Sequence, residues 1–240
     1  MKFLILLLAI PFYAKADLAS DLLKASDRAR GSVKDGVQWN AVIATEENGE
    51  SSTREFNIKA KGDDAYVEAT KPAKNKGEVY IFNDRNMWFF KPSLKKPVSI
   101  SARQKLTGQA ANGDIASTHY ARDYSAVIEK TENLNGEKMH VLMLTAKSKN
   151  LTYDKIRYWI SDKTKLAMKA EFLTLQGKPF KVGLLKYGNT LTAGGETFPF
   201  ISELAIADAK FQNNKSTITY KAPKVTQVSN SIFNVNNLTR

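Results

Sequence analysis

The sequence predicts a mainly β protein of the α+β class, in which one large antiparallel sheet curls around its own apolar face. Apolar and polar residues alternate with a period of two over most of the chain. Clusters of turn-forming residues recur between these runs, as in an antiparallel meander. The chain offers little helix to cover the strands, so a sheet of roughly eight to eleven strands is expected to curl on itself.

Composition and charge limit the classes of function. The chain has 240 residues, of which 42% are hydrophobic and 25% charged, which suits one globular domain with a sizeable core. Its net charge is +12, but the basic residues are spread over most turns, which disfavours a nucleic-acid interface. Transient contact with an anionic membrane surface remains compatible with this charge. It has no cysteine, which excludes disulfides and thiolate metal sites.

The first residues have the organisation of a secretory signal. Lys2 precedes an apolar run over residues 3–10, Pro11 breaks it, and Ala14 and Ala16 are the small residues that a signal peptidase requires. The run is shorter than the roughly 20 residues that span a bilayer, which disfavours an uncleaved anchor. We therefore expect cleavage after Ala16 (signal peptide 1–16), export to the periplasm, and a single domain over residues 17–240.

One helix and a series of strands are expected along that domain. Residues 17–30 carry apolar side chains at helical spacing, and Gly31 stands where a helix C-cap is expected. The expected strands span residues 37–44, 53–61, 65–69, 78–82, 87–90, 98–101, 124–131, 138–146, 155–161, 166–175, 180–191, 199–208 and 216–220. A polar tail over residues 224–240 is expected to dock loosely.

The stretch 77–124 contains the least regular part of the chain. Pro92 and Pro97 exclude regular structure between two expected strands, so the chain must bend there. Residues 106–117 are rich in Gly, Ala and Ser, which suits a movable flap better than a core strand. We expect Pro92, Pro97, Gly108 and Gly113 to be the lid and hinge positions of this flap.

Large apolar residues at alternate positions of the expected strands are the candidates for the inner face. Such a face is either filled by its own side chains or open to an apolar ligand, and the period of two leaves both alternatives open. A register slip of one residue would move every candidate to the outside. The candidate lining residues are Trp39, Phe56, Ile58, Trp88, Phe90, Tyr158 and Met168.

Patterns typical of catalysis or of a bound cofactor are missing from the sequence. It has no nucleophile elbow, phosphate loop or dinucleotide fingerprint, and its two histidines, His119 and His140, lack metal-ligand spacing. We therefore expect no cofactor, no metal and no enzyme. A lipid-modifying enzyme is the weaker alternative, and it would need His119 to meet an acid such as Asp114 or Asp123 in a cleft.

The run from Asn86 to Val98 resembles a known exported family. Its Trp88, the Pro92-Ser93-Leu94-Lys95-Lys96 motif and the segment 112–116 resemble the outer membrane lipoprotein-sorting proteins, relatives of the periplasmic carrier LolA. The resemblance is clearest over residues 77–124 and extends to residue 191 through 153–160. Lysine replaces arginine at both basic positions of the motif, and lysine cannot make the planar bidentate contacts of a guanidinium latch.

The resemblance implies an incomplete β-barrel whose concave face is covered by helices and holds acyl chains. It further implies a soluble periplasmic carrier for lipid or lipoprotein acyl chains, with an inner-membrane transporter and an outer-membrane acceptor as partners. The alternative is a non-catalytic envelope module that docks on a membrane transporter and whose cavity is filled by its own side chains.

Overall fold

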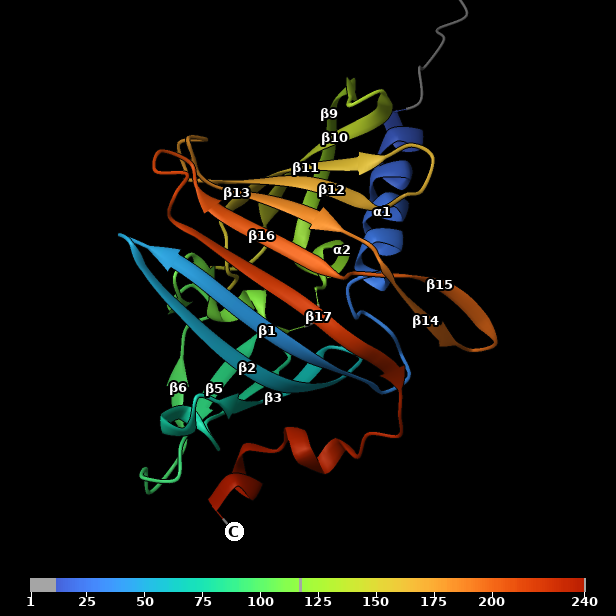
Figure 1. Cartoon of the computed structure of the whole chain (residues 1–240). Coiled ribbons are helices and arrows are strands. Elements are labelled where there is room, and N and C mark those ends of the chain that lie inside the picture. Colours follow the sequence, from blue (N-terminus) through green and yellow to red (C-terminus); the bar gives the residue numbers. More distant parts are fainter. Residues whose placement is uncertain (1–11, 117, 240) are drawn as a thin grey trace, which may run out of the picture.

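The computed structural model describes residues 12–116 and 118–239, and it consists mainly of one curled antiparallel sheet (Figure 1). Its thirteen strands lie in the order β6 (Val98–Ile100), β5 (Asn86–Phe90), β4 (Val79–Asn83), β3 (Asp64–Lys71), β2 (Glu50–Lys61), β1 (Val37–Glu47), β17 (Lys215–Val225), β16 (Glu203–Asp208), β13 (Pro179–Lys186), β12 (Ala167–Leu173), β11 (Lys155–Ser161), β10 (Glu137–Ala146) and β9 (Tyr124–Leu134). The edge strands β6 and β9 do not pair with each other, so the barrel is incomplete. The mainly β, half-barrel prediction is confirmed.

The remaining elements are short, apart from one helix. Two small hairpins, β7–β8 and β14–β15, stand apart from the large sheet. They and the helices are α1 (Phe12–Arg28), η1 (Ala73–Asn75), β7 (Lys105–Thr107), β8 (Ala110–Ala111), η2 (Asn112–Asp114), α2 (Tyr120–Asp123), β14 (Asn189–Ala193), β15 (Glu196–Phe200), η3 (Asn230–Phe233) and η4 (Val235–Thr239). Within the described residues, no helix is both long and apolar enough to cross a membrane.

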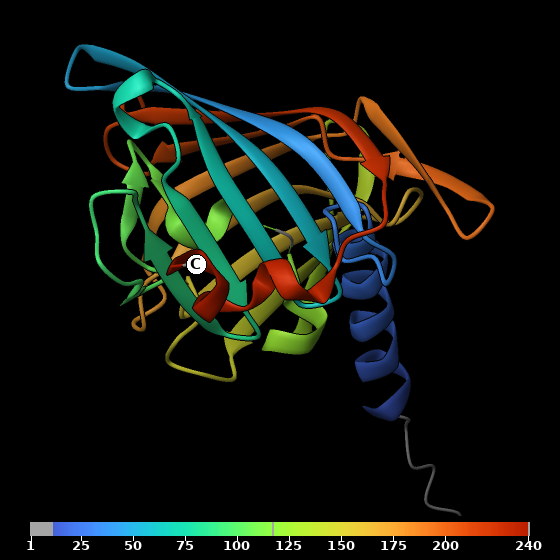
Figure 2. The same ribbon diagram turned by 90° about the horizontal axis from the view of Figure 1, so that it is seen from below.

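The core lies on the concave face of the sheet. Along β1, Trp39, Ala41 and Ile43 are buried while the residues between them are more exposed. Trp39 pairs with Ile58 and Ala41 with Phe56 across the β1–β2 ladder, so both strands turn their apolar positions inward. Helix α1 packs against β9 and α2, and its Leu22 and Leu23 are buried. The view from below shows how the strands curve around this interior (Figure 2).

Residues 101–116 and 118, here called the inner segment, lie between the edge strand β6 and α2. Most of residues 109–116 are buried in the core, whereas Ser101 and residues 103–105 are exposed. Ala110, Ala111 and Ile115 are at most 2% exposed. Small side chains let the backbone approach the sheet closely, and the buried polar groups are paired internally: the Asn112 amide donates to the Ser101 carbonyl at 3.0 Å. The segment that the sequence suggested as a movable flap is therefore packed inside the barrel in this structure.

The C-terminal tail lies on the convex face. Lys61 and Asn83, which point away from the core, donate hydrogen bonds to the tail at Asn230 and Phe233. Phe233 is buried, and η3 packs on β3 and β4. The tail is thus docked more closely than the loose arrangement that its polar composition suggested.

Several other boundaries differ from the sequence predictions, among them that of the expected strand 199–208, which is divided between β15 and β16. The expected strand 180–191 is divided at Gly188, so that β13 stays in the large sheet while β14 pairs with β15 outside it. The expected helix begins at Phe12 and ends at Arg28, and Gly31 follows with a φ of 99°. Residues 1–11 of the expected signal peptide lie outside the described residues, and cleavage after Ala16 stays a prediction.

Candidate functional site

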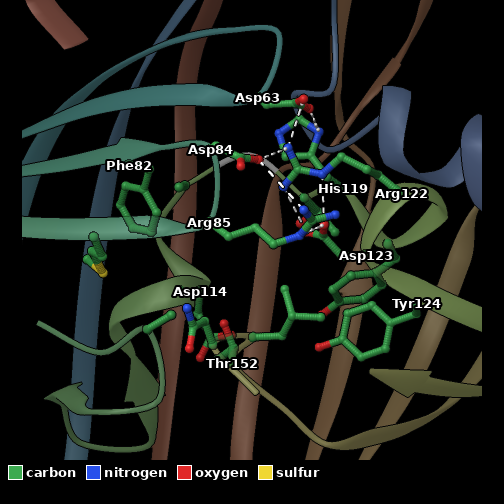
Figure 3. A pocket seen from close by; sticks show the side chains of 18 of the residues that line it. Asp63, Phe82, Asp84, Arg85, Asp114, His119, Arg122, Asp123, Tyr124 and Thr152 are labelled. Carbon is green, nitrogen blue, oxygen red and sulfur yellow. Dashed lines mark hydrogen bonds and ion pairs between the residues drawn. The ribbon is translucent and has the colours of Figure 1, made fainter. Parts of the chain in front are cut away.

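A cavity of about 80 Å³ lies between the β4–β5 hairpin, the inner segment and α2 (Figure 3). Its walls combine apolar side chains, such as Phe82, Met87 and Ala116, with charged ones. Ligand pockets usually measure about 300–1,000 Å³, so this cavity is too small for a long acyl chain unless the inner segment or α2 moves.

Five of the charged residues that line this cavity form a group of ion pairs, here called the rim cluster: Asp63, Asp84, Arg85, Arg122 and Asp123. Arg122 on α2 contacts Asp63, in the β2–β3 turn, at 2.8 Å and Asp84, in the β4–β5 turn, at 3.2 Å. Arg85 contacts Asp123 at 3.1 Å from the opposite direction. Three separate parts of the chain are therefore joined at the rim, and α2 is held against both turns (Figure 3).

His119 lies at the edge of the rim cluster. Its Nδ1 is 3.0 Å from Ser32 Oγ and 3.4 Å from an oxygen of Asp63. Burial lowers the pKa of His119 below its usual value, and the charge of Asp63 opposes that shift. A Ser-His-Asp triad uses the two ring nitrogens for its two partners, whereas both of these contacts use Nδ1. Ser32, His119 and Asp63 therefore do not have the mutual geometry of a triad.

The acids proposed as partners of His119 are engaged elsewhere. Asp114 lines the same cavity, but it accepts hydrogen bonds from the Tyr153 hydroxyl at 2.8 Å and the Ala111 amide at 2.8 Å. Burial raises the pKa of Asp114, and the nearby charge of Lys181 opposes that shift. Asp123 is bound by Arg85 and Arg122. These contacts stabilise the inner segment and α2, and they do not form a nucleophile–base pair.

Arg30 lies deeper in the protein and also lines the cavity. It follows α1, is 7% exposed, and donates from one terminal nitrogen to the Tyr158 hydroxyl at 3.1 Å. Its guanidinium carbon lies 5.4 Å from the centre of the Tyr120 ring, a cation–π contact. Its Nε is buried without a hydrogen-bond partner. Among the described residues, no carboxylate forms an ion pair with Arg30, although Asp27 and Asp114 act on it electrostatically.

Asp27 connects α1 to α2. Its Oδ2 accepts a hydrogen bond from the Ala121 backbone amide at 2.8 Å, while its Oδ1 is buried without a partner. Burial raises the pKa of Asp27 to about 7, and the backbone amides of Ala121 and Tyr120 and the charge of Arg30 limit that rise. The contact between the two helices therefore depends on a carboxyl group that titrates near neutral pH.

Four of the seven lining candidates lie on the inner face. Trp39, Phe56, Ile58 and Tyr158 are all at most 1% exposed and belong to the main core cluster. None of the four lines the cavity of about 80 Å³ directly, because they pack against one another and against α1 and the inner segment. Their role in ligand binding stays a prediction.

The other three candidates, Trp88, Phe90 and Met168, lie on the opposite face, so their predicted register was wrong. In β5 the inward residues are Met87 and Phe89, which belong to or pack on the main core. Met168 packs with Met139, Val141 and Trp159 in a separate apolar cluster. The β11–β12 ladder shifts register between Trp159 and Ile160, so that Met168 is an extra residue of β12 without a partner in β11. Met168 therefore lies on the face opposite to Ala170 and Phe172.

The four lid and hinge candidates divide into two pairs. Pro92 is exposed and Pro97 half-buried, in the loop between β5 and β6. Gly108 has a φ of 51°, and a Cβ there would lie 2.5 Å from Ser216 Oγ; a Cβ on Gly113 would lie 1.9 Å from Thr152 Oγ1. Both glycines are thus required for close packing of the inner segment, and a hinge function stays a prediction.

Sequence reasoning did not identify Arg30, Asp27 or Arg122. Arg30 and Asp27 stand at the end of an amphipathic helix, where charged residues are usually solvated. Arg122 belongs to a helix of four residues that no periodic pattern predicts. The concentration of charged residues around His119 in the sequence was the only feature that pointed to this site.

Comparison with solved structures identifies the architecture. A LolA superfamily protein from Nitrosomonas europaea is 29% identical, with a TM-score of 0.80, and the match covers 91% of this chain and 98% of that one. A domain assigned to outer membrane lipoprotein sorting, from Vibrio parahaemolyticus, is 21% identical with a TM-score of 0.75 and covers 94% of this chain and 100% of that one. The chain therefore has the LolA-like fold of these proteins.

Two further comparisons complete the assignment of this LolA-like protein. A family model with the description "uncharacterized protein" matches residues 61–240. A DUF1329 family protein from Desulfovibrio piger has the same fold, with 18% identity and a TM-score of 0.75 over 93% of this chain and 99% of that one. The search of curated proteins finds no match. The resemblance seen in the sequence is therefore confirmed, although the guanidinium contacts at the rim come from Arg85 and Arg122 and not from the Lys95-Lys96 motif.

Proposed function

We propose that this protein is a non-enzymatic periplasmic carrier that encloses the acyl chains of a lipid or lipoprotein and helps deliver them toward the outer membrane. The observation that carries the proposal is a curled sheet with an apolar concave face, open at its edge strands, beside a cavity that is bordered by ion pairs. Ion pairs near a surface contribute little individually and can exchange for water, whereas a closed ladder of strands could not open.

The energetic need for a carrier is large. Each buried methylene group contributes about 0.8 kcal/mol, so a long acyl chain crosses an aqueous compartment slowly without protection. The cavity of about 80 Å³ implies that the chain enters only after α2 separates from the β2–β3 and β4–β5 turns and the inner segment shifts. An inner-membrane transporter and an outer-membrane acceptor are the partners that such a route requires.

The test combines co-purification with competition. Protein isolated from a bacterial envelope is examined by native mass spectrometry for bound lipid, and an apolar fluorescent dye is then displaced by added lipid. Ala102→Met narrows the cavity and is expected to weaken binding, while Ala44→Met on the exposed convex face is the matched control. If the wild-type protein contained no bound lipid and did not bind the dye, the proposed carrier function would be contradicted.

The close packing of the interior favours an alternative to the carrier function. The inner segment fills much of the concave side, which suits an envelope module that docks on a membrane transporter without a ligand. Capture of a transporter by crosslinking, together with the absence of bound lipid, would favour this alternative over the carrier.

A further inference from the structure

Arg30 carries a positive charge that is buried in the interior of this protein. Burial of a guanidinium group costs several kcal/mol unless ion pairing or hydrogen bonding compensates for it. Arg30 is 7% exposed, forms no ion pair with a carboxylate of the described residues, and has a buried Nε without a partner. The rim arginines show the usual solution, since Arg122 and Arg85 both contact carboxylates directly.

The surroundings of Arg30 supply donors for an anion. The Tyr158 hydroxyl accepts from Arg30 at 3.1 Å and lies 3.2 Å from Ser26 Oγ. Tyr220 is also hydrogen-bonded to Arg30, and the Tyr120 ring lies 5.4 Å from its guanidinium carbon. Of these residues, Arg30 and Tyr120 line the cavity, so a guanidinium group and a hydroxyl-bearing side chain can present hydrogen-bond donors to a carboxylate or phosphate group there.

We propose that Arg30 recognises the anionic head, a carboxylate or phosphate, of the acyl-chain ligand. This inference rests on the proposed carrier function and adds a substrate class to it. The acyl chain follows the apolar inner face, while the head forms charge-assisted hydrogen bonds with Arg30 and neighbouring hydroxyl groups. Asp27 and Asp114 lie near Arg30, and both already accept hydrogen bonds from other groups. Asp63, Asp84 and Asp123 line the same cavity and are paired with Arg85 and Arg122.

The experiment compares ligands that share one chain and differ in the head. Lauric acid, lauryl phosphate and neutral lauryl alcohol displace an apolar dye from the full-length mature protein, and inorganic phosphate is the control without a chain. The wild-type protein is expected to bind the acid and the phosphate ester about tenfold more tightly than the alcohol, as one or more hydrogen bonds to a charged group would give.

The variants assign this preference to one residue. Arg30→Met is expected to reduce binding of the two anionic lipids to the level of the alcohol and to leave the alcohol unchanged. Arg28→Met, which removes an exposed arginine of the same helix end, is the matched control and should keep the preference. If Arg30→Met does not fold, Arg30→Lys and Tyr158→Phe provide the same comparison. We expect these two variants to lose less of the preference for the anionic lipids than Arg30→Met.

The possible failures can be told apart. Equal affinity of the wild-type protein for acid and alcohol, or an unchanged preference in Arg30→Met, would overturn the role of Arg30 and leave the carrier function standing. Displacement by inorganic phosphate alone, as strong as by lauryl phosphate, would show a site for a free anion and overturn the lipid head. Absence of displacement by all three lipids would overturn the carrier function as well.

Discussion

The arginines at the rim and the arginine in the interior have opposite environments. Arg122 is held by three carboxylates from three parts of the chain, within reach of solvent. Arg30 is buried beside tyrosines and has no carboxylate in contact among the described residues. A paired charge near water can open and close at small cost, whereas an unpaired buried charge gains most from a partner that arrives from outside. We therefore infer that the rim cluster controls access to the cavity, whereas Arg30 in the interior recognises the anionic head of the ligand.

The largest expected effects at a fixed pH come from substitutions in the inner segment. Gly113→Ala would place a Cβ 1.9 Å from Thr152 Oγ1, and Gly108→Ala would add left-handed backbone strain to a clash with Ser216. We expect each to lower the free energy of unfolding by about 1–3 kcal/mol, measured by denaturant titration. Gly194→Ala, at a similar φ of 59° but in open space, is the control and should cost about 1 kcal/mol.

The same pair of variants also tests the hinge prediction made from the sequence. If Gly108→Ala and Gly113→Ala slowed ligand exchange while stability stayed at the level of the control, these glycines would act as hinges. A loss of stability with unchanged exchange would instead confirm that they serve packing.

The next effect is a pH dependence carried by Asp27. Its pKa is about 7 in the folded protein because of burial, above the usual value near 4. The folded state therefore binds more protons than the unfolded state between these values, so the contribution of Asp27 to stability is fully present below pH ~4 and is lost as the pH rises through ~7. Asp27→Asn keeps an acceptor for the Ala121 amide and should remove this loss, which is on the order of a few kcal/mol.

The difference between wild type and Asp27→Asn isolates this effect from other titrating groups. His119, whose pKa is lowered by burial, contributes stability that is lost as the pH falls, and it titrates in both proteins. Parallel stability profiles of the two proteins from pH 4 to 8 would show that Asp27 titrates normally and that its burial has no energetic consequence.

The smallest stability effect is expected at the rim. Arg122→Gln removes contacts to Asp63, Asp84 and Asp123 and should lower stability by only ~1 kcal/mol, because the first two acids are at least half-exposed and Asp123 keeps Arg85 as a partner. Dye exchange should nevertheless become several-fold faster, measured by stopped-flow fluorescence, because α2 is released. Arg157→Gln is the matched control, since Arg157 also contacts two carboxylates but lies away from the cavity. Equal acceleration in both variants would contradict a closing role for the rim cluster.

The sequence predicts the architecture better than the interior details. Alternation is clear in β1 and β2, where one face is polar, and it places Trp39, Phe56 and Ile58 correctly. It fails in β5, because Met87, Trp88, Phe89 and Phe90 are apolar on both faces. The convex face of the neighbouring strands is covered by the tail, where Phe233 is buried.

Two other features depend on contacts that are distant in sequence. The burial of the inner segment follows from its fit against β1 and β17, and small side chains alone are equally compatible with an exposed loop. The importance of Arg30 follows from the absence of a carboxylate partner among the described residues, which a sequence pattern cannot reveal. The family motif at Pro92–Lys96 identified the fold through resemblance, although its residues lie outside the cavity.

The most direct test of an opening interior is hydrogen–deuterium exchange of the mature protein with and without lauric acid. The amides of Asn112 and Gly113 donate within the inner segment, to Gln104 and Ala102, at 2.8 and 3.0 Å. If the chain enters as proposed, these amides exchange faster in the bound protein while those of the β14–β15 hairpin are unchanged. Unchanged exchange in the inner segment under saturating ligand, or a change confined to the convex face, would contradict the account.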